Sequence, residues 1–243
     1  MTNRKLKHFE PIYYINLERS PERKAYMEEQ FAQWGVENYT RIEALDGLRS
    51  GLRSYLDGDY PRNVLMKEMA CTISHLKAIH HWLMTSKTSY AIICEDDLDM
   101  STVEVWPFTW KELMDHLPYD WDVVQLVITN PDNFTMNIHA RFEKDYGTVC
   151  YVITRHYAEK LMKLHVHGDR YKLDYTVRPR AVSDELIYNA GKTYSIPVFL
   201  YNVDFGSSIH SWHNGKHQLC REAYHKWWFD PDVKHTADPF FRL

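Results

Sequence analysis

Four acidic side chains stand close together in the first half of the chain: Glu95, Asp96, Asp97 and Asp99. Two carboxylates about 4 Å apart repel each other by roughly 4 kcal/mol at an effective dielectric constant near 20, so this cluster is expected to have a positive partner. Short carboxylates on a tight turn converge on a hard divalent cation such as Mn²⁺ or Mg²⁺. We therefore take Asp97 and Asp99 as candidate metal ligands. The alternative is a solvated acidic loop or a helix N-terminus.

The spacing of Asp97 and Asp99 matches a short motif of known chemistry. They form the D-x-D pattern with which many nucleotide-sugar transferases hold the metal that bridges the two donor phosphates. The sequence has no H-E-x-x-H, G-x-G-x-x-G, Walker lysine or G-x-S-x-G motif, which argues against a metalloprotease, dehydrogenase, P-loop enzyme or α/β-hydrolase. His210, His213 and His217 form the other metal-like pattern, but 14 histidines in 243 residues produce such clusters by chance.

The acidic cluster directly follows a continuous apolar run at 90–94, which predicts a buried central strand. Further strands are predicted at 13–17, 39–44, 122–128, 148–154 and 193–199, and helices at 21–34, 67–86, 155–165 and 182–190. Ser20 and Gly35 signal the start and stop of the first helix, Gly191 closes the last, and Pro197 places the last strand at a sheet edge. This alternation predicts an α/β layer architecture, in which ligands bind outside the carboxyl ends of the strands.

The composition is that of an ordinary folded chain. With 243 residues, 44% of them hydrophobic, we expect a single domain over 1–243, with a core at 1–210 and an aromatic-rich extension at 211–243. A net charge of -4 gives no overall field that attracts nucleic acid or an anionic membrane. The four cysteines form no C-x-x-C pair, and no leader peptide or membrane-spanning apolar run is recognisable. We therefore expect reduced thiols and a cytoplasmic location.

Five sequence blocks follow one another in the order of a known family. They are YINLERSPER at 14–23, ALDG at 44–47, EMACTISH at 68–75, ICEDD at 93–97 and GTVCYVIT at 147–154. With these blocks the chain resembles glycosyltransferase family 25, which holds bacterial lipopolysaccharide sugar transferases and collagen galactosyltransferase-like enzymes, including giant-virus members. The resemblance implies a GT-A fold, with a Rossmann-like mixed central sheet flanked by helices. It also implies Mn²⁺ and inverting transfer of a hexose, galactose or glucose, from a UDP-sugar to an acceptor hydroxyl on a glycan or protein.

The resemblance further implies which residues contact the nucleotide-sugar donor. They lie in or beside the first four blocks: Asn16, Leu17, Arg19, Arg23, Asp46, Ser74, His75, Lys77, Glu95 and Asp96. Arg23 is the candidate for a phosphate contact, and Asp46 for a ribose or uracil contact. Alternatives stay open, because the arginines could belong to a solvated helical turn, Asp46 to a plain Asp-Gly turn, and His75 to the core.

A second acidic pair lies on the acceptor side that the resemblance implies. AVSDEL at 181–186 resembles a Val-Asp-Glu segment of the family, with Ser183 in place of an apolar residue. An inverting transfer needs a carboxylate that takes the proton of the acceptor hydroxyl, and we assign this role first to Asp184 and second to Glu185. The alternative is that Ser183 caps a helix whose first turn holds both acids. GSSI at 206–209 matches a further block, and His210 beside it is a candidate metal ligand.

Two rival functions would use the same residues. A metal-dependent phosphotransferase or nucleotidyltransferase would leave phosphate, not sugar, on the acceptor. A degenerate member of the family would bind a sugar or a protein without chemistry. The sequence leaves open the transferred hexose, the acceptor and the oligomeric state. Trp212, Trp227, Trp228 and Phe229 of the extension either stack on a sugar or dock a C-terminal helix onto the core.

Overall fold

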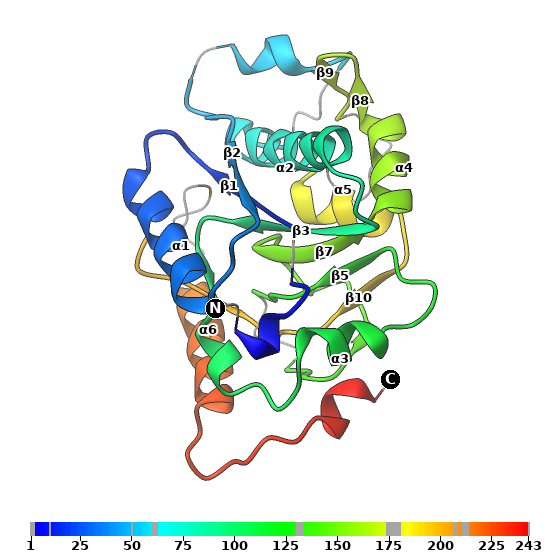
Figure 1. Ribbon diagram of the computed structural model, residues 1–243. Helices are drawn as coiled ribbons and strands as arrows, with labels where there is room; N and C mark the ends of the chain where they lie inside the picture. The colour runs from blue at the N-terminus through cyan, green and yellow to red at the C-terminus, as the bar shows by residue number, and fades with distance from the viewer. Residues whose placement is uncertain are drawn as a thin grey trace.

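A mixed seven-stranded sheet forms the centre of the molecule (Figure 1). The structure is a computed structural model, and it describes residues 3–9, 11–49, 51–59, 63–129, 134–173, 181–206, 209 and 214–242. The strand order is β2-β1-β3-β7-β5-β10-β6. The strands of this sheet are β1 (Ile12–Asn16), β2 (Tyr39–Glu43), β3 (Tyr90–Glu95), β5 (Val123–Gln125), β6 (His139–Ala140), β7 (Cys150–Thr154) and β10 (Thr193–Ser195).

Most strands of the sheet end at the same edge. β1 is parallel to β2 and β3, and β10 is parallel to β5, whereas β7 runs antiparallel between β3 and β5. β6 is antiparallel to β10. The carboxyl ends of β1, β2, β3, β5 and β10 therefore share one edge with the beginning of β7. Open α/β sheets bind their ligands at this edge.

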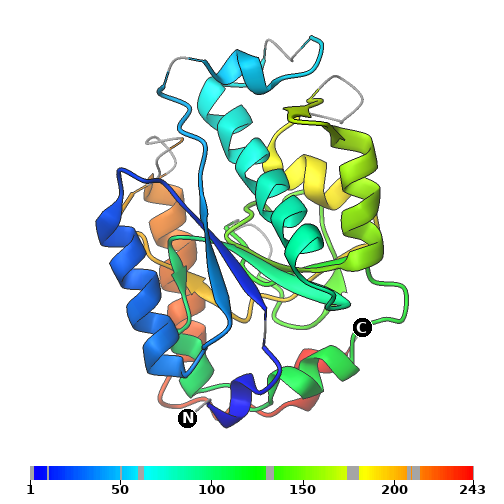
Figure 2. The ribbon, with the colours of Figure 1, turned by 45° about the horizontal axis from the view of Figure 1, so that its top comes forward.

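Helices cover both faces of the sheet, as Figures 1 and 2 show. One face carries α1 (Pro21–Trp34), α3 (Trp110–Asp115) and α6 (Asn214–Trp228), and the other carries α2 (Met66–Thr85), α4 (Arg155–His165) and α5 (Ser183–Asn189). Short 3-10 helices lie at Arg4–Leu6, Leu52–Tyr55, Ser101–Glu104 and Asp238–Phe241. There are also two small two-stranded antiparallel sheets among the described residues. One consists of β4 (Leu98–Asp99) and β11 (Leu200–Tyr201), and the other of β8 (Val166–His167) and β9 (Arg170–Tyr171). None of the described helices is long and apolar enough to cross a bilayer.

Alternate side chains of the buried strands divide between two apolar cores. In β1, Ile12 and Tyr14 pack with α1, α3 and α6, whereas Tyr13 and Ile15 pack with α2, α4 and α5. Successive side chains of a strand point to opposite faces, so a strand covered on both sides is apolar over almost its whole length. The prediction of an α/β fold with a mixed central sheet flanked by helices is therefore confirmed.

Of the residues predicted to start or stop helices, only some act as expected. Pro21 begins α1, and Gly35 ends it with a φ of 67°, in the left-handed region that glycine favours. Ser20 occupies the N-cap position, but its side chain makes no capping hydrogen bond. Gly191 does not close α5 in a left-handed conformation: the C-cap is Ala190, and Gly191 packs tightly against Tyr157, where a side chain would not fit.

The last predicted strand is shorter and less peripheral than expected. β10 ends at Ser195, two residues before Pro197, and it lies between β5 and β6. The prediction of an edge strand at 193–199 is wrong because β6 pairs with the outer side of β10. A two-residue strand such as β6 is too short to show an alternating pattern in the sequence.

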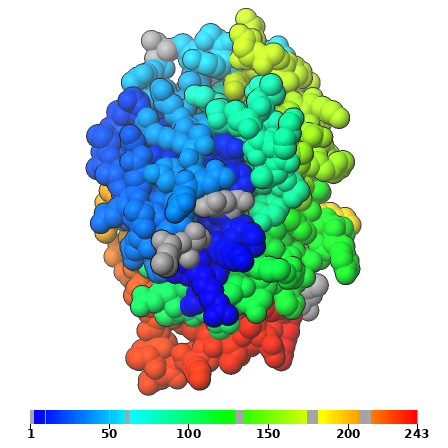
Figure 3. All heavy atoms as spheres, in the orientation of Figure 1, coloured from blue at the N-terminus to red at the C-terminus, as the bar shows by residue number. Residues whose placement is uncertain are grey.

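The aromatic C-terminal segment docks onto the core. The Trp228 ring stacks on Phe240 with their centroids 5.3 Å apart, and Phe241 stacks on His116, the C-cap of α3, at 4.1 Å. In Figure 3 this red segment runs along one end of the molecule, next to the N-terminal segment. The packing supports docking rather than sugar stacking for Trp228, whereas Trp212 lies outside the described residues.

Candidate active site

A cleft of about 990 Å³ opens at the carboxyl edge of the sheet. Its walls come from the segments after β1, β2 and β3, the loop before β7, and parts of α2, α5 and α6. This volume lies at the upper end of the range for small-ligand sites, about 300–1,000 Å³. The predicted site residues that line the cleft are Leu17, Arg19, Arg23, Asp46, Ser74, His75, Glu95, Asp96, Asp97, Asp184 and Glu185.

Asn16 and Arg23 hold Asp96 from two sides. Asn16, buried at the end of β1, donates from Nδ2 to Asp96 Oδ2 at 2.7 Å and to the backbone carbonyl of Ser20 at 3.1 Å. Arg23 donates from Nη1 to Asp96 Oδ1 at 2.7 Å and from Nη2 to the backbone carbonyl of Gly206 at 2.7 Å. Burial raises the pKa of Asp96. Because both of its oxygens are engaged, Asp96 ties β1, α1 and the acidic turn together.

Asp97 lines the cleft and has one unpaired carboxylate oxygen among the described residues. Its Oδ1 is buried and has no hydrogen-bond partner in the part of the chain that the structure describes. Its Oδ2 lies 3.7 Å from Arg23 Nη1, which also bonds Asp96. Burial, followed by the charges of Glu95 and Asp96, raises the pKa of Asp97 well above its ordinary value. A cation beside Oδ1 would satisfy this oxygen and offset the repulsion among the carboxylates.

Asp99 does not line this cleft. Its Oδ1 accepts a hydrogen bond from the backbone N–H of Ser101 at 2.9 Å, and its Oδ2 lies 3.4 Å from Arg221 Nη2 of α6. With Tyr26 and Arg221 it lines a separate hollow of about 370 Å³. The geometry therefore does not support a single ion held by Asp97 and Asp99 together, because Asp99 already pairs with a cation of the chain.

A hard cation fits Asp97 only with ligands from outside the acidic turn. Among the described residues, no three carboxylates of this turn come within ligand distance of one another. Mg²⁺ is commonly held by one or two carboxylates together with substrate phosphates, and the unpaired oxygen of Asp97 suits that arrangement. His210, the predicted further ligand, lies outside the residues that the structure describes.

Arg19 and Ser74 fix the loop that follows β2. Arg19 Nε donates to Asp46 Oδ2 at 2.8 Å, while Asp46 Oδ1 accepts from the backbone N–H of Leu48 at 3.0 Å. Burial raises the pKa of Asp46, but these hydrogen bonds and the charge of Arg19 outweigh it, so the pKa is lowered overall. Ser74, buried in α2, accepts from the backbone N–H of Leu45 at 2.8 Å. The loop is thereby anchored to α2 at one wall of the cleft.

Gly47 packs against the first turn of α2 without room for a side chain. A Cβ at Gly47 would lie 2.7 Å from Lys67 Cα and 2.9 Å from the carbonyl oxygen of Met66. We expect Gly47→Ala to lower the free energy of unfolding by about 1–3 kcal/mol, because backbone atoms must move. Thermal unfolding checks this, with Gly215→Ala as the control, since a Cβ at Gly215 meets open space. Equal melting temperatures for Gly47→Ala and the wild type would contradict the close packing.

His75, Glu95 and Thr148 form a connected polar group at the cleft. His75 Nε2 lies 3.4 Å from Glu95 Oε1, and His75 Nδ1 lies 3.2 Å from the Tyr151 hydroxyl. Thr148 Oγ1 donates to Glu95 Oε1 at 2.8 Å and lies 3.1 Å from Ser183 Oγ. Burial raises the pKa of Glu95, but the hydrogen bond and charge of His75, the hydrogen bond from Thr148 and the charge of Arg23 together lower it overall. The structure thus brings the predicted His75 and Glu95 together.

Asp184 and Glu185 lie in the first turn of α5 and line the cleft. Asp184 Oδ2 accepts a hydrogen bond from the backbone N–H of Gly147 at 3.4 Å. Glu185 is buried, accepts a hydrogen bond from Asn189, and has a pKa raised by its burial. Ser183 is the first residue of α5 and not its cap, so that part of the alternative is wrong, whereas both acids do lie in the first turn of the helix. Two carboxylates with different environments are therefore available at the cleft.

Three lysines at the cleft were not predicted from the sequence, and one lysine that was predicted there lies elsewhere. Lys67 of α2, Lys144 before β7 and Lys216 of α6 line the cleft. Lys77 instead donates from Nζ to the backbone carbonyl of Glu43 at the exposed surface, and it does not line the cleft. The start of a helix at the carboxyl edge of the sheet is a signal that could have identified Lys67. Lys144 lies in a turn, where periodicity gives no position, and Lys216 lies in the first turn of α6, a helix whose bounds were not predicted.

The fold and the cleft define an α/β protein with a large cleft at the carboxyl edge of its sheet, lined in part by acidic and basic side chains. The sequence model of glycosyltransferase family 25, described as an LPS biosynthesis protein, matches residues 9–176, which is more than half of the chain. The chain therefore belongs to glycosyltransferase family 25, and it is a glycosyltransferase.

Similarity outside the family match is weak. No curated protein matches the chain significantly. Among solved structures, A197 from STIV is 10% identical, with 79% of this chain and 85% of that chain covered and a TM-score of 0.39. HddC from Yersinia pseudotuberculosis, complexed with GMP-PN, is 10% identical, with 88% of this chain and 98% of that chain covered and a TM-score of 0.33. Similarity at this level says nothing about the donor or acceptor of this enzyme.

Proposed function

We propose that this glycosyltransferase has a GT-A fold and moves a galactose or glucose unit, with inversion, from a UDP-sugar to a hydroxyl of a glycan or protein. The single observation that carries the proposal is the buried, unpaired Oδ1 of Asp97 at a cleft of about 990 Å³. That volume suits a nucleotide sugar, and that oxygen suits a cation which the donor phosphates help to hold.

The charges around the cleft support a diphosphate near the acidic turn. Mn²⁺ or Mg²⁺ bound by Asp97 would offset the negative charge that develops on the UDP leaving group. Arg23 bonds Asp96 and keeps the cluster from repelling the donor, while Lys67 and Lys216 add positive charge at the walls. The loop after β2, fixed through Asp46, is the proposed contact for the uridine.

Asp184 is the proposed general base. The hydrogen bond from the backbone N–H of Gly147 orients its carboxylate, and the side chain lines the cleft. In a single displacement with inversion, the acceptor oxygen attacks the anomeric carbon, its proton passes to Asp184, and the bond to the UDP oxygen breaks. Glu185, buried and bonded by Asn189, is the second choice, and its pKa, raised by burial, makes it a stronger base than an exposed glutamate.

Asp184→Asn is expected to lower kcat by about 10²–10⁴-fold with little change in donor affinity, because the amide cannot accept the proton. Release of UDP in the presence of an acceptor measures kcat, and Asp169→Asn in the exposed turn between β8 and β9 is the matched control. If Glu185→Gln abolishes turnover while Asp184→Asn does not, the base is Glu185. Full activity in both variants would contradict a base at this position.

Mass spectrometry of the acceptor product tests the reaction class. The enzyme is incubated with UDP-galactose or UDP-glucose, Mn²⁺ and a panel of glycan and peptide acceptors. We expect an acceptor that gains one hexose and UDP as the other product. An acceptor that gains phosphate or a nucleotide would show that the same acids serve phosphoryl or nucleotidyl transfer.

A further inference from the structure

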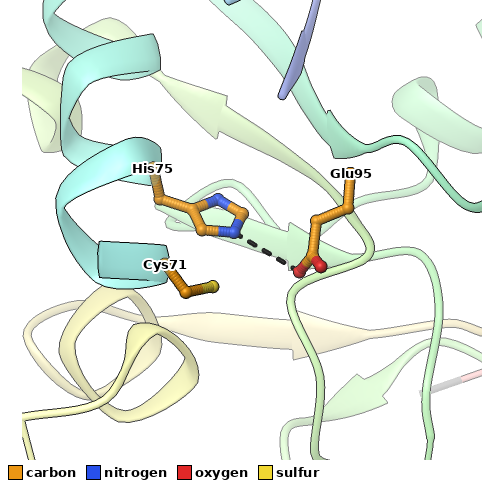
Figure 4. A group of neighbouring side chains, drawn as sticks. All are labelled: Cys71, His75 and Glu95. Atoms are coloured by element: carbon orange, nitrogen blue, oxygen red, sulfur yellow. Dashed lines mark ion pairs between the residues drawn. The ribbon is translucent and has the colours of Figure 1, made fainter. Parts of the chain in front are cut away.

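Three side chains of different chemistry converge beside the cleft. Cys71 and His75 lie one turn apart on α2, and Glu95 is the last residue of β3 (Figure 4). One ligand atom from each, the thiol sulfur, a ring nitrogen and a carboxylate oxygen, all lie within 4.8 Å of one another. Figure 4 shows Cys71 and the His75 ring directed toward Glu95. Residues at positions i and i+4 of a helix share one face, so α2 presents Cys71 and His75 as a pair.

The spacing is close to that of a tetrahedral zinc site. Zn–N and Zn–O bonds of about 2.0–2.2 Å place two tetrahedral ligands roughly 3.4 Å apart, and a Zn–S bond of about 2.3 Å widens the spacing slightly. His75 Nε2 and Glu95 Oε1 lie 3.4 Å apart. Since all three ligand atoms lie within 4.8 Å of one another, a small movement of the Cys71 side chain would bring the sulfur into the same sphere.

Neighbouring residues already orient the ligands. The Tyr151 hydroxyl lies 3.2 Å from His75 Nδ1, which leaves Nε2 directed at Glu95, and Thr148 Oγ1 bonds Glu95 at 2.8 Å. Hydrogen bonds of this kind to metal-bound histidine and carboxylate set ring orientation and raise affinity. All three ligands line the cleft, so a fourth position would open toward it.

We propose that Cys71, His75 and Glu95 form a three-ligand site for a thiophilic divalent cation such as Zn²⁺. Sulfur and imidazole ligands favour Zn²⁺ over Mn²⁺ and Mg²⁺, so this site is chemically distinct from the oxygen site at Asp97. His75 and Glu95 are also predicted contacts of the donor, so an ion held here competes with the donor for these two side chains. This second statement rests on the proposed function, whereas the site itself does not.

Cobalt spectroscopy tests the site directly, because Co²⁺ replaces Zn²⁺ and reports its ligands. On titration with Co²⁺ we expect a thiolate-to-cobalt band that saturates at one equivalent, is displaced by Zn²⁺, and is lost in Cys71→Ser and in His75→Gln. Cys220→Ser is the matched control, because Cys220 is buried in α6 and bonds the carbonyl of Ile128. A wild type without the band, or a band unchanged in His75→Gln, would overturn the proposal.

A more conservative substitution distinguishes weaker binding of the ion from unfolding of the protein. Tyr151→Phe keeps all three ligands and removes only the hydrogen bond to His75. We expect Co²⁺ affinity to fall by roughly 10–100-fold, with the band shape retained. An unchanged affinity would contradict the orienting role of Tyr151 and the His75 ligand with it.

Competition with UDP tests the second statement. Zn²⁺ is expected to weaken UDP binding at least about tenfold in the wild type, but not in Cys71→Ser. If the protein shows the cobalt band and binds no nucleotide, the proposed function fails while the metal site stands. If it binds UDP and shows no band, the metal site fails while the proposed function stands.

Discussion

Asp97→Asn is expected to lower kcat/KM by about 10³-fold, the largest effect on activity that we expect from a single substitution. A metal ion supplies several kcal/mol of charge stabilisation in the transition state, and each 1.36 kcal/mol or so corresponds to a factor of ten. An amide in place of the carboxylate keeps the shape of Asp97 but loses its charge. Steady-state kinetics at saturating Mn²⁺ measure the loss, and Asp99→Asn, whose side chain lies outside the cleft, is the control.

The same substitution is expected to stabilise the metal-free protein. Burial and the charges of Glu95 and Asp96 raise the pKa of Asp97, so folding favours its protonated form. The free energy of unfolding of the wild type therefore falls as pH rises above the ordinary value of 3.8, and Asp97→Asn removes this loss. The Tm difference between Asp97→Asn and the wild type, in EDTA, should be positive and should grow as the pH rises above 3.8.

The two readouts must move in opposite directions. A variant that loses both activity and stability would show that Asp97 is structural and not a metal ligand. Activity that is equal in the wild type and Asp97→Asn would contradict the metal assignment itself.

Arg23→Met is expected to destabilise the protein by about 3–5 kcal/mol, because it leaves buried carboxylates without their counter-charge. The Arg23 and Asp96 side chains are only 11% and 10% exposed, and they meet at 2.7 Å. At roughly 2–4 °C per kcal/mol for a chain of this size, Tm should fall by about 10 °C. Arg19→Met is the matched control: Arg19 is 45% exposed in its ion pair with Asp46, so a loss of at most about 1 kcal/mol is expected.

Added Mn²⁺ should restore part of the stability lost in Arg23→Met, since a cation at Asp97 replaces some of the missing positive charge. Thermal unfolding with and without Mn²⁺ measures this rescue. Equal destabilisation by Arg23→Met and Arg19→Met would contradict the central role of the buried pair. Destabilisation that Mn²⁺ leaves unchanged would place the cation elsewhere.

The order of the main elements could be predicted because each carries a strong local pattern. The strand predicted at 90–94 and the helix predicted at 67–86 appear as β3 and α2, within one or two residues of the expected bounds. β4, β6, β8, β9 and β11 are too short for any periodicity, and the antiparallel direction of β7 depends on long-range pairing with β3 and β5. Pro197 was misleading because β10 ends at Ser195, so the proline lies outside the strand and does not limit its pairing.

The site could be predicted where a strand end fixes the position of a side chain. Asp97 and His75 reach the cleft because β3 and α2 carry them there, as the blocks indicated. Spacing alone misplaced Asp99, since the chain turns into β4 and Arg221, 122 residues later in the sequence, binds its carboxylate. Cys71 stood four residues before His75, a spacing that signals a shared helix face, but its partner Glu95 is apparent only from the fold.

Calorimetric titration of UDP, UDP-glucose and UDP-galactose, with and without Mn²⁺, tests the central claim that the cleft is a metal-dependent donor site. We predict Mn²⁺-dependent UDP binding to the wild type and to Asp99→Asn, and binding at least about tenfold weaker to Asp97→Asn. The UDP-sugar that binds more tightly then identifies the hexose. A protein that binds no nucleotide under any metal condition, or an Asp97→Asn variant that binds UDP as tightly as the wild type, would contradict the claim.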